Sequence, residues 1–338
     1  MKRKTKTRSK AGKVFARILL TLLIVVLVLL GVMYGVPLTE HVDKTRVSGS
    51  ADWMQDLDDA LLLSEITLPG THDSATQYVG LTFFSRCQDG TIRDQLDRGY
   101  RYLDIRLGMD EEGMKLMHGF VNCKTGPMLW SPALRLETVL TQCYEFLDAH
   151  PTETVVFAVK KEHGSETAAA FAKALEAVID ENPEYWYTGN TIPTLREARG
   201  KLVLFRRYVD RSLPEDGDCY GISMAWVNQN GHNDVSQNTV EETINGTYTL
   251  WVQDRYEYGA EDKWNAFTAG LAAAPADGEN IALHFLSTKG TLPYGHAWSF
   301  AKTLNGRLAQ EQPPLSGWVI LDFGTAELAE QIYRTNFQ

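Results

Sequence analysis

Short apolar runs alternate with amphipathic segments along most of the chain after residue 50. The apolar runs are rich in Val, Ile and Leu, as in buried parallel strands, and the amphipathic segments repeat their apolar residues at the helical spacing. Strand and helix in turn predict a parallel sheet covered by helices, and at this length a closed (β/α)8 barrel is favoured over an open sheet. The predicted strands are 66–68, 101–109, 153–162, 200–208, 247–256, 280–287 and 317–324, and the predicted helices are 134–151, 165–183, 261–275 and 298–312.

The N-terminal end has a different pattern. Residues 1–17 carry eight Lys and Arg and no acid, and residues 18–36 are 19 uncharged, mostly apolar residues. As a helix these would span about 28 Å, close to the hydrocarbon thickness of a bilayer. Because the stretch is longer than a signal-peptide core and no small-residue cleavage site follows it, an uncleaved signal anchor is favoured over a cleaved signal peptide.

This interpretation divides the chain into four parts. Residues 1–17 form a basic cytoplasmic segment, 18–36 a transmembrane anchor, 37–50 a polar tether outside the membrane, and 51–338 one barrel domain. The chain is then a single-pass protein of the cell membrane with its domain on the extracytoplasmic side. Subtracting the eight N-terminal cations from the formal net charge of -10 leaves about -18 on the remainder. This acidity argues against nucleic acid as a partner and against polybasic docking to anionic lipid.

The segment LPGTHDSAT, residues 68–76, raises the first question about chemistry. Ile66–Leu68 predicts a short buried strand, and Pro69-Gly70 predicts its end, which leaves His72 and Asp73 just beyond it. The alternative is a turn in which Asp73 caps the next helix and His72 is solvated.

Polar residues also stand at the ends of the other predicted strands. The full set is His72, Asp73, Asp104, Arg106, His118, Lys160, Arg207, Asp254, Tyr256 and Asp322. In a parallel barrel the carboxyl ends of the strands meet at one mouth, where catalytic residues are found. Cations at the mouth of an acidic protein favour an anionic ligand, and two histidines favour a paired base and acid. Asp104 and Arg106 are two residues apart, so both would point into the barrel.

Some of these residues have a purely structural alternative. For Asp104, Lys161 and Arg206, an ion pair within the barrel core is as reasonable as a catalytic role. His284 follows an apolar run and is predicted to be a hydrogen-bonded core histidine.

Four cysteines, with no C-x-x-C pair, argue against a zinc site; they are Cys87, Cys123, Cys143 and Cys219. An exported domain permits disulfides, and Cys87–Cys123 is the favoured pair because both lie close in sequence to the polar strand ends. Free buried thiols are the alternative.

Seven segments together resemble the bacterial phosphatidylinositol-specific phospholipase C family, in order and spacing, from about Trp53 to the C-terminus. They are LPGTHDSAT, RYLDIRLG, LMHGF, VFAVKKE, GKLVLFRRY, WVQDRY and GWVILDF. The resemblance implies a distorted (β/α)8 barrel acting as a phosphatidylinositol diacylglycerol-lyase. In that reaction the inositol 2-hydroxyl attacks the phosphodiester, diacylglycerol leaves, and inositol 1,2-cyclic phosphate forms.

Other substrates and one other class of function stay open. The substrate could be phosphatidylinositol, a glycosylated inositol lipid or another head-group ester, and a non-catalytic head-group-binding barrel is the alternative from another class. The presence of both His72 and His118 argues against the last, because binding alone requires neither a base nor an acid.

The resemblance also implies catalytic roles. His72 would be the general base and His118 the general acid, with Asp322 orienting His72 and Asp73 supporting His118. Eukaryotic-type relatives hold Ca²⁺ with carboxylates near the position of Arg106. Since a guanidinium cannot ligate a cation, we expect no metal and no other cofactor. Arg106, two residues after Asp104, would instead contact the phosphoryl oxygens.

Head-group and membrane contacts complete the predicted site. The resemblance implies head-group binding by Lys160, Arg207, Asp254 and Tyr256. The choice between Lys160 and Lys161 stays open because it depends on the phase of the strand. Membrane-interface candidates, for which core packing is an equal alternative, are Phe83, Phe84, Tyr294 and Trp298. The expected partner is an inositol phospholipid in a membrane, and the chain is expected to be a monomer.

Overall fold

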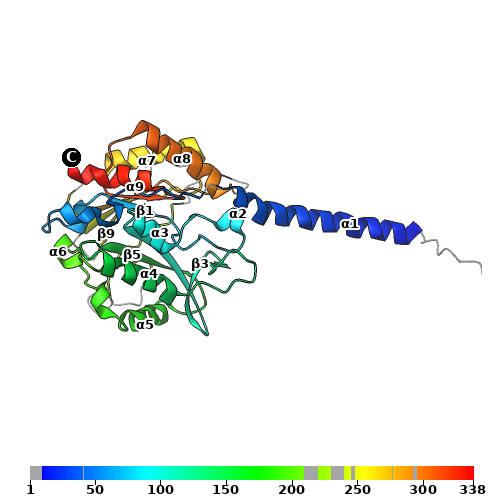
Figure 1. Cartoon of the computed structure of the whole chain (residues 1–338), viewed down its shortest axis with the longest axis horizontal. Helices are drawn as coiled ribbons and strands as arrows, with labels where there is room; N and C mark the ends of the chain where they lie inside the picture. Colours follow the sequence, from blue (N-terminus) through cyan, green and yellow to red (C-terminus); the bar gives the residue numbers. More distant parts are fainter. Residues whose placement is uncertain are drawn as a thin grey trace, which may run out of the picture.

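A long helix projects from one side of a rounded domain in the computed structural model (Figure 1). The structure describes residues 10–40, 42–208, 220–229, 240–244, 248–275, 277–291 and 295–338. Helix α1 (Lys10–Leu30) has no buried residues and continues through the short turns η1 (Gly31–Gly35) and η2 (Val36–Thr39). By length and composition, the stretch Lys10–Thr39 is able to cross a membrane.

A curled, mainly parallel sheet forms the centre of the domain. Its main path runs in the order β6-β7-β5-β2-β1-β12-β11-β10-β9. Along the chain, these strands are β1 (Leu68–Thr71), β2 (Tyr102–Asp110), β5 (Val155–His163), β6 (Trp186–Tyr187), β7 (Leu202–Arg206), β9 (Val240–Ile244), β10 (Tyr248–Gln253), β11 (Asn280–Phe285) and β12 (Trp318–Leu321). Three short additions lie off this path: β3 (Gly113–His118) pairs with β2, β4 (Val121–Asn122) with β3, and β8 (Ile222–Ser223) with β7.

This sheet is the distorted barrel expected from the alternating pattern. Among the described strands, no ladder joins β9 to β6 or β8, so the predicted barrel is open along that side. The predicted order of strands is otherwise confirmed. Along the path β7-β5-β2-β1-β12-β11-β10, each strand pairs in parallel with the next.

Helices cover the outer faces of the sheet. The four predicted helices are present as α4 (Leu136–Ala149), α5 (Ala168–Ile179), α7 (Ala260–Ala273) and α8 (Ala297–Glu311). Figure 1 shows α4 and α5 on one side of the sheet and α7, α8 and α9 (Ala326–Tyr333) on the other. The shorter helices are α2 (Thr82–Ser85), α3 (Ile92–Asp97), α6 (Leu195–Ala198), η3 (Ser50–Asp56), η4 (Leu63–Glu65), η5 (Pro183–Tyr185) and η6 (Arg334–Phe337).

Strand β2 shows how the sequence places polar groups inside the barrel. One face of β2 packs in the same apolar cluster as α4, through Leu103, Ile105 and Leu107. The opposite face begins with the buried Tyr102, which packs inside the barrel, and continues with Asp104 and Arg106. Because side chains alternate across a strand, a change from apolar to polar on one face directs these two charges inward at the carboxyl end.

The Pro69-Gly70 pair lies inside β1 rather than at its end, which corrects the sequence prediction. A Cβ on Gly70 would stand 2.8 Å from the Cβ of Tyr102, so glycine allows β1 and β2 to approach closely. The Pro69 carbonyl accepts from the Arg101 N–H (2.8 Å), one residue before the β1–β2 ladder begins at Gly70 and Tyr102. The missing N–H of proline therefore falls outside that ladder.

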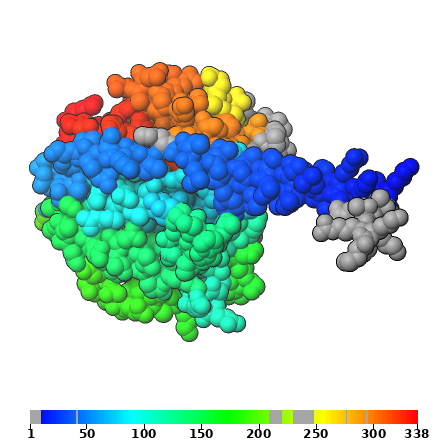
Figure 2. Space-filling model, turned by 45° about the vertical axis from the view of Figure 1, so that its right-hand side comes forward, coloured from blue at the N-terminus to red at the C-terminus, as the bar shows by residue number. Residues whose placement is uncertain are grey.

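The segment predicted as a tether is packed against the domain. We call residues 37–40 and 42–47 the strap. The Glu40 carboxylate pairs with Arg86 (3.0 Å) and with His296, and the Asp43 N–H donates to Asp89 (2.6 Å). Figure 2 shows the N-terminal residues as a continuous blue band across the domain surface. The segment is therefore bound to the domain along part of its length, because its acids Glu40 and Asp43 are buried against polar groups of the domain. Its role as a tether outside a membrane stays a prediction.

Candidate active site

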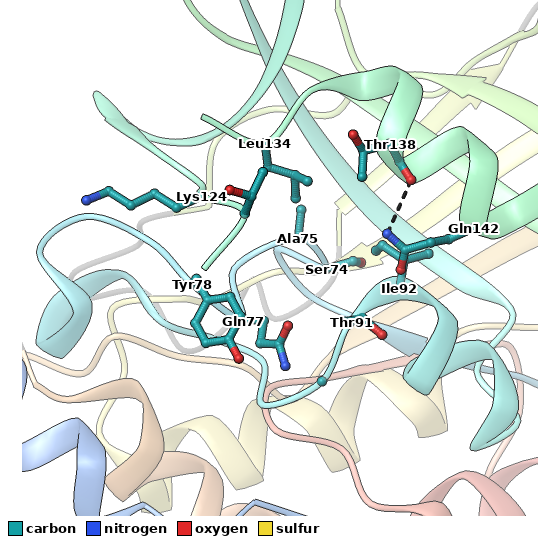
Figure 3. Close-up of a pocket in the computed structure, with 12 residues that line it drawn as sticks. Ser74, Ala75, Gln77, Tyr78, Thr91, Ile92, Lys124, Leu134, Thr138 and Gln142 are labelled. Atoms are coloured by element: carbon teal, nitrogen blue, oxygen red, sulfur yellow. Dashed lines mark hydrogen bonds between the residues drawn. The ribbon is translucent and has the colours of Figure 1, made fainter. Parts of the chain in front are cut away.

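A pocket of about 580 Å³ opens at the carboxyl ends of the central strands. Eight of the ten predicted strand-end residues line it, namely His72, Arg106, His118, Lys160, Arg207, Asp254, Tyr256 and Asp322. The other two, Asp73 and Asp104, are buried beside it. A second hollow of about 120 Å³ lies between the loop after β1, the segment before α3 and the start of α4 (Figure 3). Of these two hollows among the described residues, the first is the one that brings the predicted residues together.

His72 is positioned by the pairing of β1 with β12. That register places Thr71 beside Leu321, and the His72 N–H donates to the Leu321 carbonyl (2.9 Å). Asp322 directly follows β12, and its Oδ1 atom lies 2.8 Å from His72 Nδ1. A carboxylate on Nδ1 favours the tautomer with its proton there, which leaves Nε2 as the basic atom.

Arg106 contacts this basic atom. The charges of Arg106 and Asp322 shift the pKa of His72 in opposite directions. The Arg106 Nη2 atom lies 2.7 Å from His72 Nε2. Burial lowers the pKa of His72, and Arg106 lowers it further, but the Asp322 carboxylate outweighs them with the help of Asp73, so the pKa of His72 is raised above its ordinary value. Nε2 is thus the ring atom placed to accept a proton.

Asp73 joins the second histidine to the first. Its backbone is left-handed (φ 45°), an uncommon conformation for a residue other than glycine. In this conformation its Oδ2 lies 3.0 Å from His118 Nδ1 and 3.1 Å from Arg106 Nη1. Burial raises the pKa of Asp73, and Arg106 together with the two histidines offsets this only in part. Strained backbone at such a point is typical of functional sites, where the surrounding contacts compensate for it.

Asp104 holds two guanidinium groups in place from beneath the pocket. Its Oδ2 accepts from Arg106 Nη2 (3.0 Å), and its Oδ1 accepts from Arg207 Nη1 (3.0 Å). Arg207 also stacks on the ring of Trp226, 3.6 Å from its centroid. Burial would raise the pKa of Asp104, but the two guanidinium groups outweigh it and lower this pKa well below its ordinary value. Both alternatives for Asp104 therefore have support, since it forms a buried ion-pair network and this network orients pocket residues.

The register between β2 and β5 resolves the choice between the two lysines. Lys160 is opposite Arg106 in that register and lines the pocket. Lys161 instead pairs with Glu166 (3.3 Å).

Glu162 lines the pocket but was not among the predicted residues. It pairs with Lys160 Nζ (2.6 Å), lies 3.4 Å from Arg106 and accepts from the Gly119 N–H (2.9 Å). Burial raises the pKa of Glu162, yet Arg106 and Lys160 lower it to about 2. The spacing of two residues between Lys160 and Glu162 could have revealed it, because such residues share a face of a strand.

Two further pocket residues carry no sequence signal. Trp226 donates from Nε1 to the Asp254 carboxylate (3.2 Å), and Asn228 accepts from the Tyr256 hydroxyl (2.7 Å). Both belong to the irregular segment after β8, so no periodic pattern marks them. They hold the two predicted residues that follow β10 against the pocket wall.

Comparisons with known proteins match this arrangement. A family model described as "Phosphatidylinositol-specific phospholipase C, X domain" matches residues 70–208. The "1-phosphatidylinositol phosphodiesterase" of Staphylococcus aureus (strain NCTC 8325 / PS 47) is 30% identical over 315 residues, which cover 87% of this chain and 90% of that protein. This chain belongs to the phosphatidylinositol-specific phospholipase C family.

Other members of the phosphatidylinositol-specific phospholipase C family are also similar. The 1-phosphatidylinositol phosphodiesterase of Listeria monocytogenes (serovar 1/2a) is 28% identical over 191 residues, which cover 52% of this chain and 55% of that protein. Among solved structures, the F249X mutant of the Staphylococcus aureus phospholipase C superposes with a TM-score of 0.71 at 27% identity, covering 85% of this chain and 98% of that chain. The predicted family and fold are confirmed.

The Cys87–Cys123 disulfide that we predicted from the sequence is absent. Cys87 and Cys123 are both free and buried, as is Cys143, while Cys219 lies outside the described residues. The Cys87 sulfur lines the pocket and lies 4.0 Å from His118 Nδ1. The prediction of a Cys87–Cys123 bond was wrong because closeness in sequence to the site says nothing of whether two Cβ atoms meet.

Among the described residues, one group of side chains has the atom types and spacing of metal ligands. Atoms of His72, Asp73 and Cys87 lie within 4.8 Å of one another. Arg106 already contacts two of the three, at 2.7 Å from His72 and 3.1 Å from Asp73. Burial, with Asp322 and Asp73, raises the pKa of the Cys87 thiol well above its ordinary value, which disfavours the thiolate that a metal would bind. We therefore assign no metal to this group, and metal independence stays a prediction.

The aromatic membrane candidates separate into different environments. Phe84 is exposed and lines the pocket mouth, whereas Phe83 stacks on His296 with the ring centroids 4.4 Å apart. Trp298 packs edge-on against Phe323 at 5.0 Å, which favours the core-packing alternative. Tyr294 lies outside the described residues.

The structure also shows the surroundings of His284 and Arg206, for which the sequence suggested a structural role. His284 is buried, as predicted, but neither ring nitrogen has a hydrogen-bond partner among the described residues, and burial lowers its pKa to about 3. The predicted hydrogen bond is thus wrong, and the ring is held neutral by its apolar surroundings. Arg206 donates to the Gly221 carbonyl (3.3 Å) and does not line the pocket.

Proposed function

We propose that this protein cleaves phosphatidylinositol, or a glycosylated inositol lipid, to diacylglycerol and inositol 1,2-cyclic phosphate. One observation carries the proposal: a single pocket holds two histidines, each with a carboxylate near its Nδ1 atom, and one arginine that contacts His72 directly and is linked to His118 through Asp73. The names of the similar proteins, 1-phosphatidylinositol phosphodiesterase, agree with it. A binding module would require neither a base nor an acid, so we favour an enzyme.

The proposed mechanism assigns one proton transfer to each histidine. His72 Nε2 removes the proton of the inositol 2-hydroxyl, whose oxygen attacks the phosphorus, while Asp322 stabilises the imidazolium that forms. His118 gives a proton to the diacylglycerol oxygen as the bond from phosphorus to that oxygen breaks. Asp73, whose Oδ2 lies 3.0 Å from His118 Nδ1, would hold this ring in position.

Arg106 is proposed to contact the phosphoryl oxygens. In the free protein its guanidinium is held by Asp73, Asp104 and Glu162, so its position is fixed before substrate binds. A preorganised cation stabilises the negative charge that builds up on these oxygens in the transition state. Because Arg106 can stabilise this negative charge, no divalent ion is required for that purpose. We accordingly propose a metal-independent reaction.

The opposite wall of the pocket is proposed to bind the inositol ring. Lys160, Arg207 and Asp254 offer donors and acceptors to the ring hydroxyls, and the Tyr256 ring offers a flat face for the sugar. An unpaired buried carboxylate is costly, so Asp254 would disfavour head groups that lack a hydroxyl there.

We further propose that α1 anchors the chain in a membrane as a monomer, with the domain on the extracytoplasmic side. The length and apolar composition of Lys10–Thr39 support this, as does the basic segment that precedes it. An anchor keeps the pocket at a high effective concentration relative to lipid in its own membrane.

Phosphorus NMR tests the proposed reaction. The full chain, reconstituted in vesicles that contain phosphatidylinositol and treated with EDTA, should convert the phosphodiester signal to that of a five-membered cyclic phosphate. A linear phosphate formed without any cyclic intermediate would show a hydrolase instead. Unchanged substrate, with the inositol head group still bound, would overturn the enzyme proposal in favour of a binding module.

A further inference from the structure

The end of the proposed membrane anchor is fixed beside the pocket mouth. Turns η1 and η2, which follow α1, pack against α2, and α2 carries the pocket residue Phe84. Arg86, directly after α2, donates to the Glu40 carboxylate (3.0 Å) and to the Pro37 carbonyl (3.4 Å) of the strap. In Figure 1, α2 and β3 lie on the side of the domain from which α1 projects, and the C-terminus lies on the opposite side.

A loop next to α2 displays an apolar tip. We call residues 124–133 the tip loop. Its base is closed by a bridge between Lys124 and Ala133, and it is tied to the segment before α2, where the Lys124 N–H donates to the Tyr78 carbonyl (2.7 Å). The small hollow of Figure 3 lies at this base and is lined in part by Tyr78 and Lys124.

Hydrogen bonds within the tip loop keep its end extended from the domain. The Ser131 N–H donates to the Met128 carbonyl (3.0 Å), and Lys124 Nζ donates to the Leu129 carbonyl (2.7 Å). The apolar side chains at the end are therefore presented by a defined turn and do not fold back onto the domain.

Most of the exposed large apolar side chains of the domain belong to the stretch of chain from α2 to the tip loop. Outside α1, its turns and the strap, the large hydrophobic residues exposed in the described part of the chain are Phe84, Phe120, Met128, Leu129, Trp130, Val227 and Phe337. Trp130 is the most exposed of them, at 81%, and Phe120, at 73%, follows the pocket residue Gly119. Five of these seven fall in three places along the chain: α2, the residue after Gly119, and the end of the tip loop. Isolated exposed hydrophobics are ordinary, but three adjacent ones, Met128, Leu129 and Trp130, mark an interaction surface.

We infer that Met128, Leu129 and Trp130 of the tip loop insert into the bilayer that α1 crosses, as a second point of attachment besides the anchor. The inference rests on the proposed function and membrane anchoring above. A lipid surface is the occupant that fits, because the anchor enters the domain next to the same elements. The tip loop carries no acid although the domain is strongly acidic, and it offers Lys124 and an indole, side chains that suit the interfacial region of a membrane.

Two attachment points would fix the orientation of the pocket. An anchor alone allows the domain to rotate about the helix, whereas contacts at the strap, α2 and the tip loop hold the mouth between His118 and Phe84 against the lipid surface. The phosphodiester of a lipid in the same membrane could then reach the pocket without the lipid leaving the bilayer.

Quenching of tryptophan fluorescence tests the insertion directly. The full chain is reconstituted in phosphatidylcholine vesicles with and without brominated acyl chains, as wild type, Trp130→Phe and Trp251→Phe. Trp251 donates to Asn280 (2.8 Å) at the start of β11, away from the pocket, and serves as the control. The intensity lost to bromolipid should fall in Trp130→Phe and stay at its wild-type value in Trp251→Phe. Equal losses in wild type and Trp130→Phe would overturn the inference.

Turnover in two substrate forms gives a second test. Leu129→Asp should reduce the turnover of phosphatidylinositol in the vesicle roughly tenfold, because a buried leucine contributes on the order of that factor. It should leave turnover of a monomeric, short-chain phosphatidylinositol within about twofold of wild type. Phe337→Asp, also an exposed hydrophobic but next to the C-terminus, is the matched control and should change neither.

The two tests separate the inference from the proposed function. Wild type that turns over neither substrate contradicts the proposed function, while the quenching result still decides the insertion. Wild type that turns over both, with Leu129→Asp equal to wild type on both, contradicts the insertion and leaves the proposed function intact.

Discussion

The floor and the wall of the pocket are built in different ways. The floor comprises His72, Asp73, Asp104, Arg106 and Asp322, whose side chains are at most 18% exposed and form one connected set of ion pairs. The wall comprises Lys160, Arg207, Asp254 and Tyr256. Lys160 is 33% exposed and Tyr256 makes its hydrogen bond to the irregular segment after β8, although Arg207 is 9% exposed and is paired with Asp104 of the floor. Chemistry is thus proposed for the preorganised part and recognition for the more accessible part.

This difference has an energetic basis. A buried charge that loses its partner remains desolvated, which typically destabilises a protein by about 3–5 kcal/mol. Changes in the floor should therefore affect both turnover and stability. At the wall, the Lys160–Glu162 pair is partly screened by solvent, so a change at Lys160 should affect mainly binding. The predictions below test whether the two regions separate in this manner.

The largest effect is expected from removing either histidine. His72→Ala and His118→Ala should each reduce turnover roughly 10²- to 10⁴-fold, because each removes one proton transfer from the reaction. Initial rates on phosphatidylinositol vesicles measure this. His150→Ala is the control, since His150 pairs with Asp52 (2.6 Å) outside the pocket. Near-wild-type turnover in either pocket variant, with the domain folded by circular dichroism, would refute the assigned roles.

Replacing the central guanidinium tests whether charge alone is sufficient. Arg106→Lys keeps the positive charge but loses the planar fork that contacts three carboxylates, so turnover should fall roughly 10²- to 10³-fold. Steady-state kinetics should show the loss in kcat more than in KM. Arg206→Lys, a neighbour of the wall residue Arg207 that does not line the pocket, should stay close to wild type. Equal losses in both variants would indicate a general effect of the substitution on folding.

Asp322→Asn should change both the rate and its pH dependence. Turnover should fall at least about tenfold, because an amide no longer favours the required tautomer of His72. Activity needs the neutral imidazole and is lost as the pH falls through the pKa of His72. Asp322 is the main cause that raises this pKa, so removing its charge should lower it and shift the acidic limb of kcat/KM to lower pH. An unshifted or upward-shifted limb in the pH profile would contradict the assignment of His72 as the base.

The smallest effect is expected at the wall. Lys160→Met should raise KM about three- to tenfold with little change in kcat, because one hydrogen bond to a ring hydroxyl is lost. Lys161→Met is a matched control one residue away, on the opposite face of β5, and should leave KM unchanged. A thermal melt of both variants shows whether Glu162, left without Lys160, disturbs the floor. A loss in kcat as large as that of Arg106→Lys would remove the distinction between wall and floor.

Much of the architecture could be predicted from local pattern. The alternation of strands and helices, the inward face shared by Asp104 and Arg106, and the apolar N-terminal helix each follow from periodicities within one segment. Glu162 could have been found in the same way, since it shares a face of β5 with Lys160. Trp226 and Asn228 could not, because an irregular segment has no periodicity that fixes where its side chains point.

The sequence alone determined which side chains of each strand point inward, that is, the faces of the strands. It also determined which segment is apolar enough to cross a membrane. The tertiary structure decided the partners. Asp322 reaches His72 across 250 residues because β1 and β12 are neighbours in register, and the strap is bound because its acids meet Arg86, His296 and Asp89. Faces follow from the local geometry of one strand or helix, whereas partners depend on long-range pairing of strands that short segments do not encode.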